Sequence, residues 1–477
     1  MLEFDYNANT NRLVMRCDDA DLFQVIREHF SVENENARFA RRYNRFAPSR
    51  KYIITGTGTC ELGIYWEIRK FLVKEQINTE ITTSPNLKKA LNVGLSVDLC
   101  DDFNFKLRDY QEAVVRKALN LGRGTCVLGT GAGKTFITAA LIENFFRNSP
   151  DPDTFKCLML VPDLGLVTQT YDEFINCGST FKLTKWTGKI KPDLTANVII
   201  ANIGIIQSRF EENDWLKYVD LLIVDEAHKI SSGNKISKIV HKIKTQNKYG
   251  FTGTLPESLV DKWSIIGKLG PVIYEKSSYE LRLEDHLANV NVKVLELNYT
   301  QRINYTTHNR YREELDFVYE NADRNNFLTK LCDKLPNNIL LLVNHIKHGE
   351  ELQEYLKKAK TKQVYFIRGE VAVEEREEIK QIMENHDNVV CIAISAIFST
   401  GINIKNLHNI IFAAGGKSFI RTVQSIGRGL RKHASKDKLI IMDICDNLPY
   451  GKRHSEKRKA IYDKEKISYK EVQVKPF

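Results

Sequence analysis

The stretch CVLGTGAGKT, Cys126 to Thr135, lies between an apolar run and the helix-like segment FITAALIENFF. Its three glycines let the backbone turn tightly and expose N–H groups, while its lysine and final threonine suit phosphate and magnesium. The strict phosphate-loop spacing needs a further glycine at position 128, where this chain has leucine. Taken alone, the stretch therefore fits either a nucleotide site or a glycine-rich turn.

A second stretch, DLLIVDEAH, favours the nucleotide site. It is an apolar strand that ends in two adjacent carboxylates, Asp225 and Glu226. The carboxyl ends of parallel strands open onto the crevice where ligands bind, and adjacent strand residues point to opposite sides. Asp225 is thus expected to hold Mg²⁺, and Glu226 to orient and deprotonate an attacking water. The alternative is a strand end capped by solvated acids.

A third stretch, QSIGRGLRKH, places Arg428 and Arg431 three residues apart on a predicted helix. They share one face of that helix and can spread the charge that develops on a γ-phosphate. The second half of the chain has no lysine loop of its own, so the arginines are expected to serve a triphosphate bound by the first half. By itself the helix could simply be basic.

The apolar runs predict an α/β fold. From about residue 103, runs such as KCLMLVP, ANVIIANI, NILLLVNH and KLIIMDI alternate with helical patterns. Short apolar strands separated by helices are typical of parallel sheets covered on both faces. The chain is too long for one core. We therefore predict a small N-terminal α+β domain (1–102) and two large α/β domains (103–283 and 284–477).

Positive charge gathers in two places, although the formal net charge is only +10. Residues 37–51 hold six Lys/Arg and no acid, and residues 451–477 hold nine Lys/Arg against four Asp/Glu. Such clusters indicate a polyanionic partner. In the first, arginines alternate with aromatics and could clamp phosphates and stack bases, or the aromatics could pack a small core. The second is either a basic helix on duplex DNA or a solvated tail.

Composition excludes several classes of protein. The nine cysteines are scattered without a C-x-x-C pair or a metal-like spacing, which favours reduced, buried thiols. No apolar run is long enough for a membrane span, and the N-terminus lacks a signal-peptide pattern. We expect a cytoplasmic protein, in the host cytoplasm if it is a phage protein, that acts as a monomer.

With these stretches in their order, the chain resembles the superfamily 2 helicases and translocases over most of residues 105–445. LRDYQEA resembles the Q motif, LGTGAGKT motif I, LMLVPDLGLVTQTYDEF motif Ia, VDEAH motif II (the DEAH box) and FTGTL motif III. FSTGINIKNL and QSIGRGLRKH resemble motifs V and VI, and these and the N-terminal segment are similar to the phage branch-migration helicases. One departure is Asn403, where motif V often carries an aspartate. The short remainder after motif VI argues against a DEAH-type RNA helicase.

The resemblance implies two RecA-like domains in tandem and a set of functional residues. ATP is expected to contact Gln111, Gly129, Thr130, Gly131, Ala132, Gly133, Lys134, Thr135, Gly401 and Asn403. Catalysis is expected from Lys134, Asp225, Glu226, Arg428 and Arg431, with Mg²⁺ on Thr135 and Asp225. Coupling between hydrolysis and motion is expected from His228, Thr252, Thr254 and Gln424. Nucleic acid is expected at Arg38, Arg41, Arg42, Arg45, Pro162, Gln169, Gln207, Asn344, His345, Ser399 and Thr400.

The leading hypothesis is an ATP-dependent helicase that remodels branched DNA in replication, recombination and repair. Its expected partner is forked, four-way or double-stranded DNA bound without sequence preference, with RNA–DNA hybrids as a further candidate. An RNA helicase on the same motor is the close alternative, since no motif reveals 2′-hydroxyl contacts. Two others are a regulatory NTP-binding module, disfavoured by the intact catalytic set, and the motor of a restriction complex, which normally carries additional domains.

Overall fold

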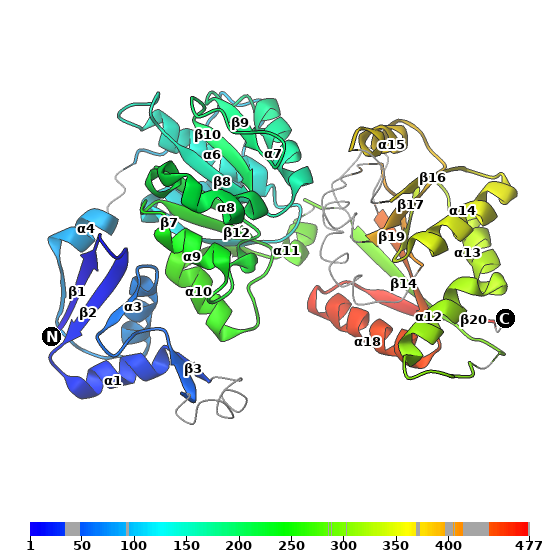
Figure 1. The fold of residues 1–477 in the computed structure, drawn as a ribbon, viewed down its shortest axis with the longest axis horizontal. Helices are drawn as coiled ribbons and strands as arrows, with labels where there is room; N and C mark the ends of the chain where they lie inside the picture. The colour runs from blue at the N-terminus through cyan, green and yellow to red at the C-terminus, as the bar shows by residue number, and fades with distance from the viewer. Residues whose placement is uncertain are drawn as a thin grey trace. The chain divides into compact units, whose positions relative to one another are not determined.

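A computed structural model shows two compact units. The structure describes residues 1–33, 48–91, 95–284, 286–287, 289–301, 303–368, 373–395, 404, 406–413 and 438–475. The first unit consists of residues 1–128 and 133–276, and the second of residues 277–477 together with the four-residue stretch 129–132. Each unit contains one large parallel sheet (Figure 1).

The sheet of the first unit has seven parallel strands. Their order is β13 (Val272–Lys276), β7 (Arg123–Leu128), β12 (Lys248–Thr252), β11 (Leu221–Asp225), β8 (Cys157–Val161), β10 (Val198–Asn202) and β9 (Leu183–Trp186). The covering helices are α5 (Asp109–Leu121), α6 (Lys134–Arg147), α7 (Leu164–Cys177), α8 (Ile203–Arg209), α9 (Lys235–Lys242) and α10 (Leu259–Leu269). Packing joins α5, α6 and α7 into one layer and α8, α9 and α10 into another (Figure 1). Every residue of β7, β8 and β12 is buried, as expected for strands covered on both faces.

The sheet of the second unit also has seven parallel strands. Their order is β16 (Gln363–Ile367), β17 (Val389–Ile394), β15 (Ile339–Val343), β18 (Asn409–Phe412), β19 (Lys438–Asp446), β14 (Asn289–Leu297) and β20 (Tyr469–Val474). Its helices are α11 (Ser278–Leu283), α12 (Arg310–Glu320), α13 (Ala322–Lys334), α14 (Ile346–Ala359), α15 (Val373–Asn385) and α18 (Pro449–Lys464). The two sheets confirm the predicted α/β fold with two RecA-like domains.

The N-terminal region forms a small mixed sheet of order β5-β2-β1-β6, as the α+β prediction required. Its strands are β1 (Leu2–Asn7), β2 (Arg12–Cys17), β5 (Thr59–Glu61) and β6 (Ile81–Thr83), with β3 (Ser31–Glu33) and β4 (Arg50–Tyr52) as a separate pair. Its helices are α1 (Ala20–His29), α3 (Ile64–Lys74) and α4 (Pro85–Leu91). The region packs directly on α10: the Gly63 amide donates to the Gly267 carbonyl at 2.8 Å, and the Phe30 and Trp263 rings lie 5.2 Å apart.

The basic C-terminal segment is a folded part of the second unit. Arg458 of α18 is buried and pairs with the buried Asp443 of β19 at 2.8 Å, and the Tyr462 hydroxyl donates to the same carboxylate at 2.9 Å. Burial opposes the charged form of Arg458, but the Asp443 carboxylate outweighs it, so the pKa of Arg458 is raised. After this helix, β20 pairs in parallel with β14 and completes the sheet.

The cysteines, all of them among the described residues, form no disulfide bonds. All nine are free and eight are buried. Burial raises the pKa of the Cys332 and Cys391 thiols to about 12, which keeps them protonated.

Within the described part of the chain, no helix combines the length and the apolar character that crossing a bilayer requires.

Candidate nucleotide and nucleic-acid sites

The glycine-rich loop joins the end of β7 to the start of α6. Gly131 and Gly133 have φ values of +84° and +72°, in the left-handed region that residues with a side chain rarely adopt. Gly133 is the N-cap of α6, so Lys134 is the first residue of that helix. The loop thus ends at a helix N-terminus, where unpaired backbone amides and the helix dipole favour phosphate.

Lys134 lies across the start of this loop. Its ammonium donates to the Leu128 carbonyl at 3.2 Å. Leu128 is the last residue of β7, is fully buried and pairs with Lys276 of β13. Position 128 therefore belongs to the strand and needs no glycine, which explains how the loop tolerates leucine there.

Gln111 lies against the helix end of the loop. It is only 3% exposed, and its side-chain oxygen accepts a hydrogen bond from the Arg108 amide at 2.9 Å. A Cβ atom at Gly133 would lie 2.4 Å from the Gln111 side-chain nitrogen, so a side chain at this position would displace Gln111. The structure therefore brings Gln111, separated from the loop in sequence, next to the N-cap of α6.

The two carboxylates follow β11. Asp225 is the last residue of that strand, and its carboxylate accepts from the Glu226 amide at 2.9 Å. Glu226 has φ and ψ of +52° and +51°. A left-handed conformation is uncommon for a residue with a side chain and is found mainly where function requires it. The strand thus ends at Asp225, and Glu226 is the N-cap of the short 3-10 helix Ala227–Lys229.

A chain of close polar contacts connects Glu226 to the end of β12. The Nδ1 atom of His228 lies 3.2 Å from the Glu226 carboxylate and 3.1 Å from the Thr252 hydroxyl. The Thr252 hydroxyl donates its proton to the Thr254 carbonyl at 2.8 Å. Because that proton is used, Thr252 can only accept from His228, which requires a proton on Nδ1.

The order of the strands places the glycine-rich loop, the two acids and the two threonines close to one another. β12 lies between β7 and β11, with Thr252 opposite Val127 and Phe251 opposite Asp225. The loop after β7, the acids after β11 and the threonines after β12 therefore start from the carboxyl edges of three neighbouring strands. Lys134, Glu226, His228, Thr252 and Thr254 therefore lie at one edge of the first sheet.

The donor set fits magnesium bound together with a nucleotide. Thr135 follows Lys134 on α6, and Asp225 ends β11, so they supply a hydroxyl and a carboxylate. Among the described residues, no three or more His, Cys, Asp or Glu form a group able to hold a metal ion on their own. Mg²⁺ commonly binds through one or two protein oxygens plus phosphates and water, and a hydroxyl and a carboxylate are oxygen ligands of that kind.

Three of the expected nucleic-acid residues in the first unit follow two neighbouring strands. Pro162 follows β8, Gln169 lies on α7 after it, and Gln207 lies on α8 after β10. Asn202 joins the two segments: its side-chain nitrogen donates to the Pro162 carbonyl at 2.9 Å, while its oxygen caps α8 by accepting from the Gly204 amide. Sequence reasoning missed Asn202, although an asparagine before a helix is a capping signal.

In the second unit, Asn344 and His345 directly follow β15. The Asn344 side-chain oxygen accepts from the Ser395 hydroxyl at 2.6 Å, and Ser395 follows the neighbouring strand β17. The His345 ring lies 5.4 Å from the ring of Tyr319 on α12. Ser395 and Tyr319 were not singled out from the sequence, because no spacing relates them to Asn344 or His345.

The remaining sequence-based assignments lie outside the described residues. They are Arg38, Arg41, Arg42, Arg45, Ser399, Thr400, Gly401, Asn403, Gln424, Arg428 and Arg431. Their roles stay predictions.

Comparison with known proteins places the chain in a family. Residues 104–257 match the family described as Type III restriction enzyme, res subunit, and residues 323–433 match the Helicase conserved C-terminal domain. Together these matches cover more than half of the chain, and the phage T4 protein named ATP-dependent DNA helicase uvsW is 27% identical over 90% of this chain and 88% of its own length. The chain belongs to the superfamily 2 helicases.

Two further similarities support the same family. The DNA 3′-5′ translocase XPB2 of Sulfurisphaera tokodaii is 26% identical over 79% of this chain and 88% of its own. The crystal structure of the Pyrococcus furiosus Hef helicase domain is 16% identical, with a TM-score of 0.52 over 74% of this chain and 98% of that one, and shares its fold. As a superfamily 2 helicase, this protein is an ATP-dependent enzyme that hydrolyses ATP.

Proposed function

We propose that this helicase is a DNA motor that unwinds and branch-migrates forked and four-way DNA in replication, recombination and repair, with R-loops as further substrates. The observation that carries the proposal is the extent of the similarity to the protein named ATP-dependent DNA helicase uvsW, which covers 90% of this chain. The uncovered tenth is shorter than the N-terminal domain, so the similarity reaches beyond the two RecA-like domains.

In this proposal the first RecA-like domain binds the triphosphate. Lys134 neutralises the β- and γ-phosphates beside the amides that begin α6. Thr135 and Asp225 hold the magnesium that accompanies the nucleotide. Glu226, oriented by His228, takes a proton from the attacking water. ATP with Mg²⁺ supplies the phosphoryl transfer that drives the motor.

The second RecA-like domain contributes cations in the same proposal. Arg428 and Arg431 approach the γ-phosphate and spread the charge that develops during its transfer. Their approach and release make ATP turnover a cycle of domain movement. The chain from Glu226 through His228 and Thr252 to Thr254 supports a role in transmitting the state of the phosphate to the DNA-binding segments.

DNA is held through its phosphates. The segments around Pro162 and Gln207 grip one region of a strand, and Asn344 with His345 grips another. Because phosphate contacts carry no sequence information, binding is independent of sequence and strongly sensitive to salt.

The proposal is tested by measuring ATPase stimulation with forked DNA, four-way junctions, duplex DNA, an RNA–DNA hybrid and RNA. Gel analysis of labelled forks and junctions then reports unwinding and branch migration. We expect branched DNA to stimulate hydrolysis most and to be resolved only when ATP is present. Stimulation by RNA alone would establish the RNA helicase alternative and end this proposal.

We further propose that the helicase works as a monomer in the cytoplasm, or in the host cytoplasm if it belongs to a phage. Light scattering on the purified protein with and without forked DNA tests the first point. A mass of two or more chains in the active complex contradicts it.

A further inference from the structure

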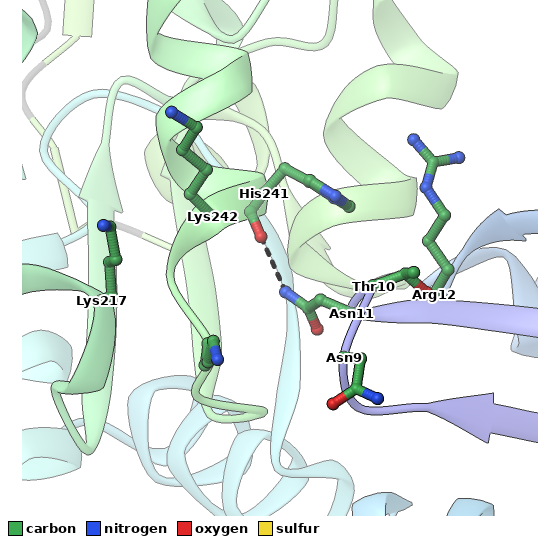
Figure 2. A pocket seen from close by; sticks show the side chains of 8 residues that line it. Asn9, Thr10, Asn11, Arg12, Lys217, His241 and Lys242 are labelled. Atoms are coloured by element: carbon green, nitrogen blue, oxygen red, sulfur yellow. Dashed lines mark hydrogen bonds between the residues drawn. The ribbon is translucent and has the colours of Figure 1, made fainter. Parts of the chain in front are cut away.

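A cavity of about 460 Å³ lies within the first unit, between the turn that joins β1 to β2 and the first RecA-like domain (Figure 2). The described residues that line it are Asn9, Thr10, Asn11, Arg12, Lys217, His241, Lys242 and Lys244. Its volume falls within the range usual for ligand sites in proteins. Nothing in the nucleotide site or the proposed DNA grips uses these residues.

The turn is fastened to the RecA-like domain at one point. Asn11 adopts a left-handed conformation with φ +55°, and its side-chain nitrogen donates to the carbonyls of His241 at 2.8 Å and Ile243 at 3.1 Å. The Tyr6 hydroxyl donates to the Asn11 side-chain oxygen at 2.8 Å. Figure 2 shows the bond from Asn11 to His241, with Arg12 beside the turn and Lys217 on the opposite wall. One wall of the cavity is therefore attached to the other through the side chain of Asn11.

Positive charge dominates the lining. Four of the eight lining residues are Arg or Lys, and none of the eight is acidic. Lys217 and Lys242 pair with Asp214 and Glu211 at 2.6 and 2.5 Å, but these acids are 79% and 69% exposed. Exposed pairs of this kind are weak, so a phosphate can replace the carboxylates. His241 is engaged separately, with its Nδ1 atom 3.0 Å from Glu61.

The cavity lies away from the nucleotide site. Lys217 lies in the short helix Asp214–Tyr218 that precedes β11, and Lys242 and Lys244 precede β12. They are therefore at the amino edge of the sheet, whereas Asp225 and Thr252 end the same two strands at the carboxyl edge. A ligand in the cavity leaves the nucleotide site open.

We propose that this cavity binds the phosphodiester backbone of DNA, as a second DNA site shared by the N-terminal domain and the first RecA-like domain. Lysine and arginine supply the attraction, and asparagine and threonine are common hydrogen-bond donors to phosphate oxygens. Asn9 and Thr10 are exposed on the turn and present such donors. The inference rests on the proposed function, because a second duplex arm exists only on branched DNA.

The experiment compares two double variants of the full chain. Lys242→Gln/Lys244→Gln removes two cavity charges, and Lys88→Gln/Lys89→Gln removes two exposed charges from α4 of the N-terminal domain. The affinity for a fluorescein-labelled forked DNA is measured by anisotropy over a series of salt concentrations. Each lost phosphate contact lowers the slope of log affinity against log salt by about 0.9.

We expect the cavity variant to lower this slope by about 1–2 and to weaken fork binding about tenfold at low salt, while the control keeps the parent slope. Equal slopes in both variants overturn the proposal. If the double variant does not fold, Lys217→Gln is measured instead, with an expected slope change of about 1. This experiment measures DNA binding only. A negative result here removes the cavity inference, whereas the absence of unwinding in the earlier assay would remove the proposed function.

Discussion

Replacing Gly133 with alanine tests whether Gln111 and the glycine-rich loop form one site. The added Cβ would lie 2.4 Å from the Gln111 side-chain nitrogen, and Gly133 has a φ of +72°. The Gln111 amide is buried, and its oxygen is held by the Arg108 amide at 2.9 Å. The clash is therefore relieved by moving the group that is expected to read adenine.

Gly233 is the matched control. Its φ is +78°, and a Cβ added there meets nothing within 4 Å. A left-handed alanine costs about 1–2 kcal/mol at either position. For a domain of this size that corresponds to a melting temperature lower by about 2–8 °C. Both variants should lose this stability, so any further effect of Gly133→Ala comes from the displaced Gln111.

The assay is steady-state ATP hydrolysis with saturating forked DNA, together with thermal unfolding. We expect the KM for ATP to rise at least about tenfold in Gly133→Ala relative to Gly233→Ala, equivalent to about 1.4 kcal/mol of lost binding. Adding Gln111→Ala to Gly133→Ala should raise KM no further, because both changes remove the same contact. A Gly133→Ala enzyme with the KM of the control, or a fully additive double variant, refutes the reasoning.

Three other outcomes are expected. Glu226→Gln should lower kcat for ATP hydrolysis at least about 100-fold, because it removes the base that activates water. Nucleotide binding, measured with a fluorescent analogue, should persist. An unchanged kcat would show that Glu226 is not the base. Thr252→Val should separate hydrolysis from unwinding, because it removes the hydroxyl between His228 and Thr254; the ratio of strands separated to ATP consumed should fall, and a constant ratio contradicts the coupling role. Burial raises the pKa of Glu61, but the hydrogen bond from His241 and the charge of nearby Lys268 outweigh it and lower that pKa from 4.5 to about 2. The contribution of Glu61 to stability is therefore present above pH 4.5 and lost as the pH falls towards 2. Over this range the melting temperature of Glu61→Gln should approach that of the parent protein. A difference in melting temperature that stays constant with pH contradicts this expectation.

The part of the candidate nucleotide site in the first unit could be predicted from sequence because its residues lie in short local patterns. The glycines, lysine and threonine of the loop are consecutive, and the paired acids end an obvious apolar strand. Contacts made across the fold carry no such pattern. The approach of Gln111 to Gly133, the bond from Asn202 to Pro162 and the bond from Ser395 to Asn344 all depend on which strands are neighbours.

The sequence KYGFT of β12 does not form a continuous apolar run, and its surroundings explain why it is nevertheless a buried strand. β12 contains Lys248 within a fully buried strand, and a lysine ordinarily argues against burial. Its ammonium donates to the carbonyls of Val240 and Ile243 at 2.8 and 2.6 Å, and burial lowers its pKa. Only the end of α9 provides these acceptors, so the strand was recognisable only after the helix was placed.

The packing of the basic C-terminal segment was likewise decided only by the tertiary structure. Its composition indicated a basic helix, and α18 is that helix, but the sequence left its position open between DNA and solvent. Asp443 decides how the helix packs, because this buried carboxylate requires a cation and Arg458 lies 2.8 Å from it. A contact between the exposed face of α18 and DNA stays a prediction.

The sequence by itself determined the fold class and the order of the helicase motifs and predicted the residues of the triphosphate site, because periodicity and short motifs are local properties of the chain. The tertiary structure alone decided which distant residues meet: the fastening of the N-terminal turn to the end of α9, the basic cavity beside it and the link from His228 to Thr252. These arise where strands and turns far apart in sequence become neighbours, and a side chain's partners are then set by the fold around it.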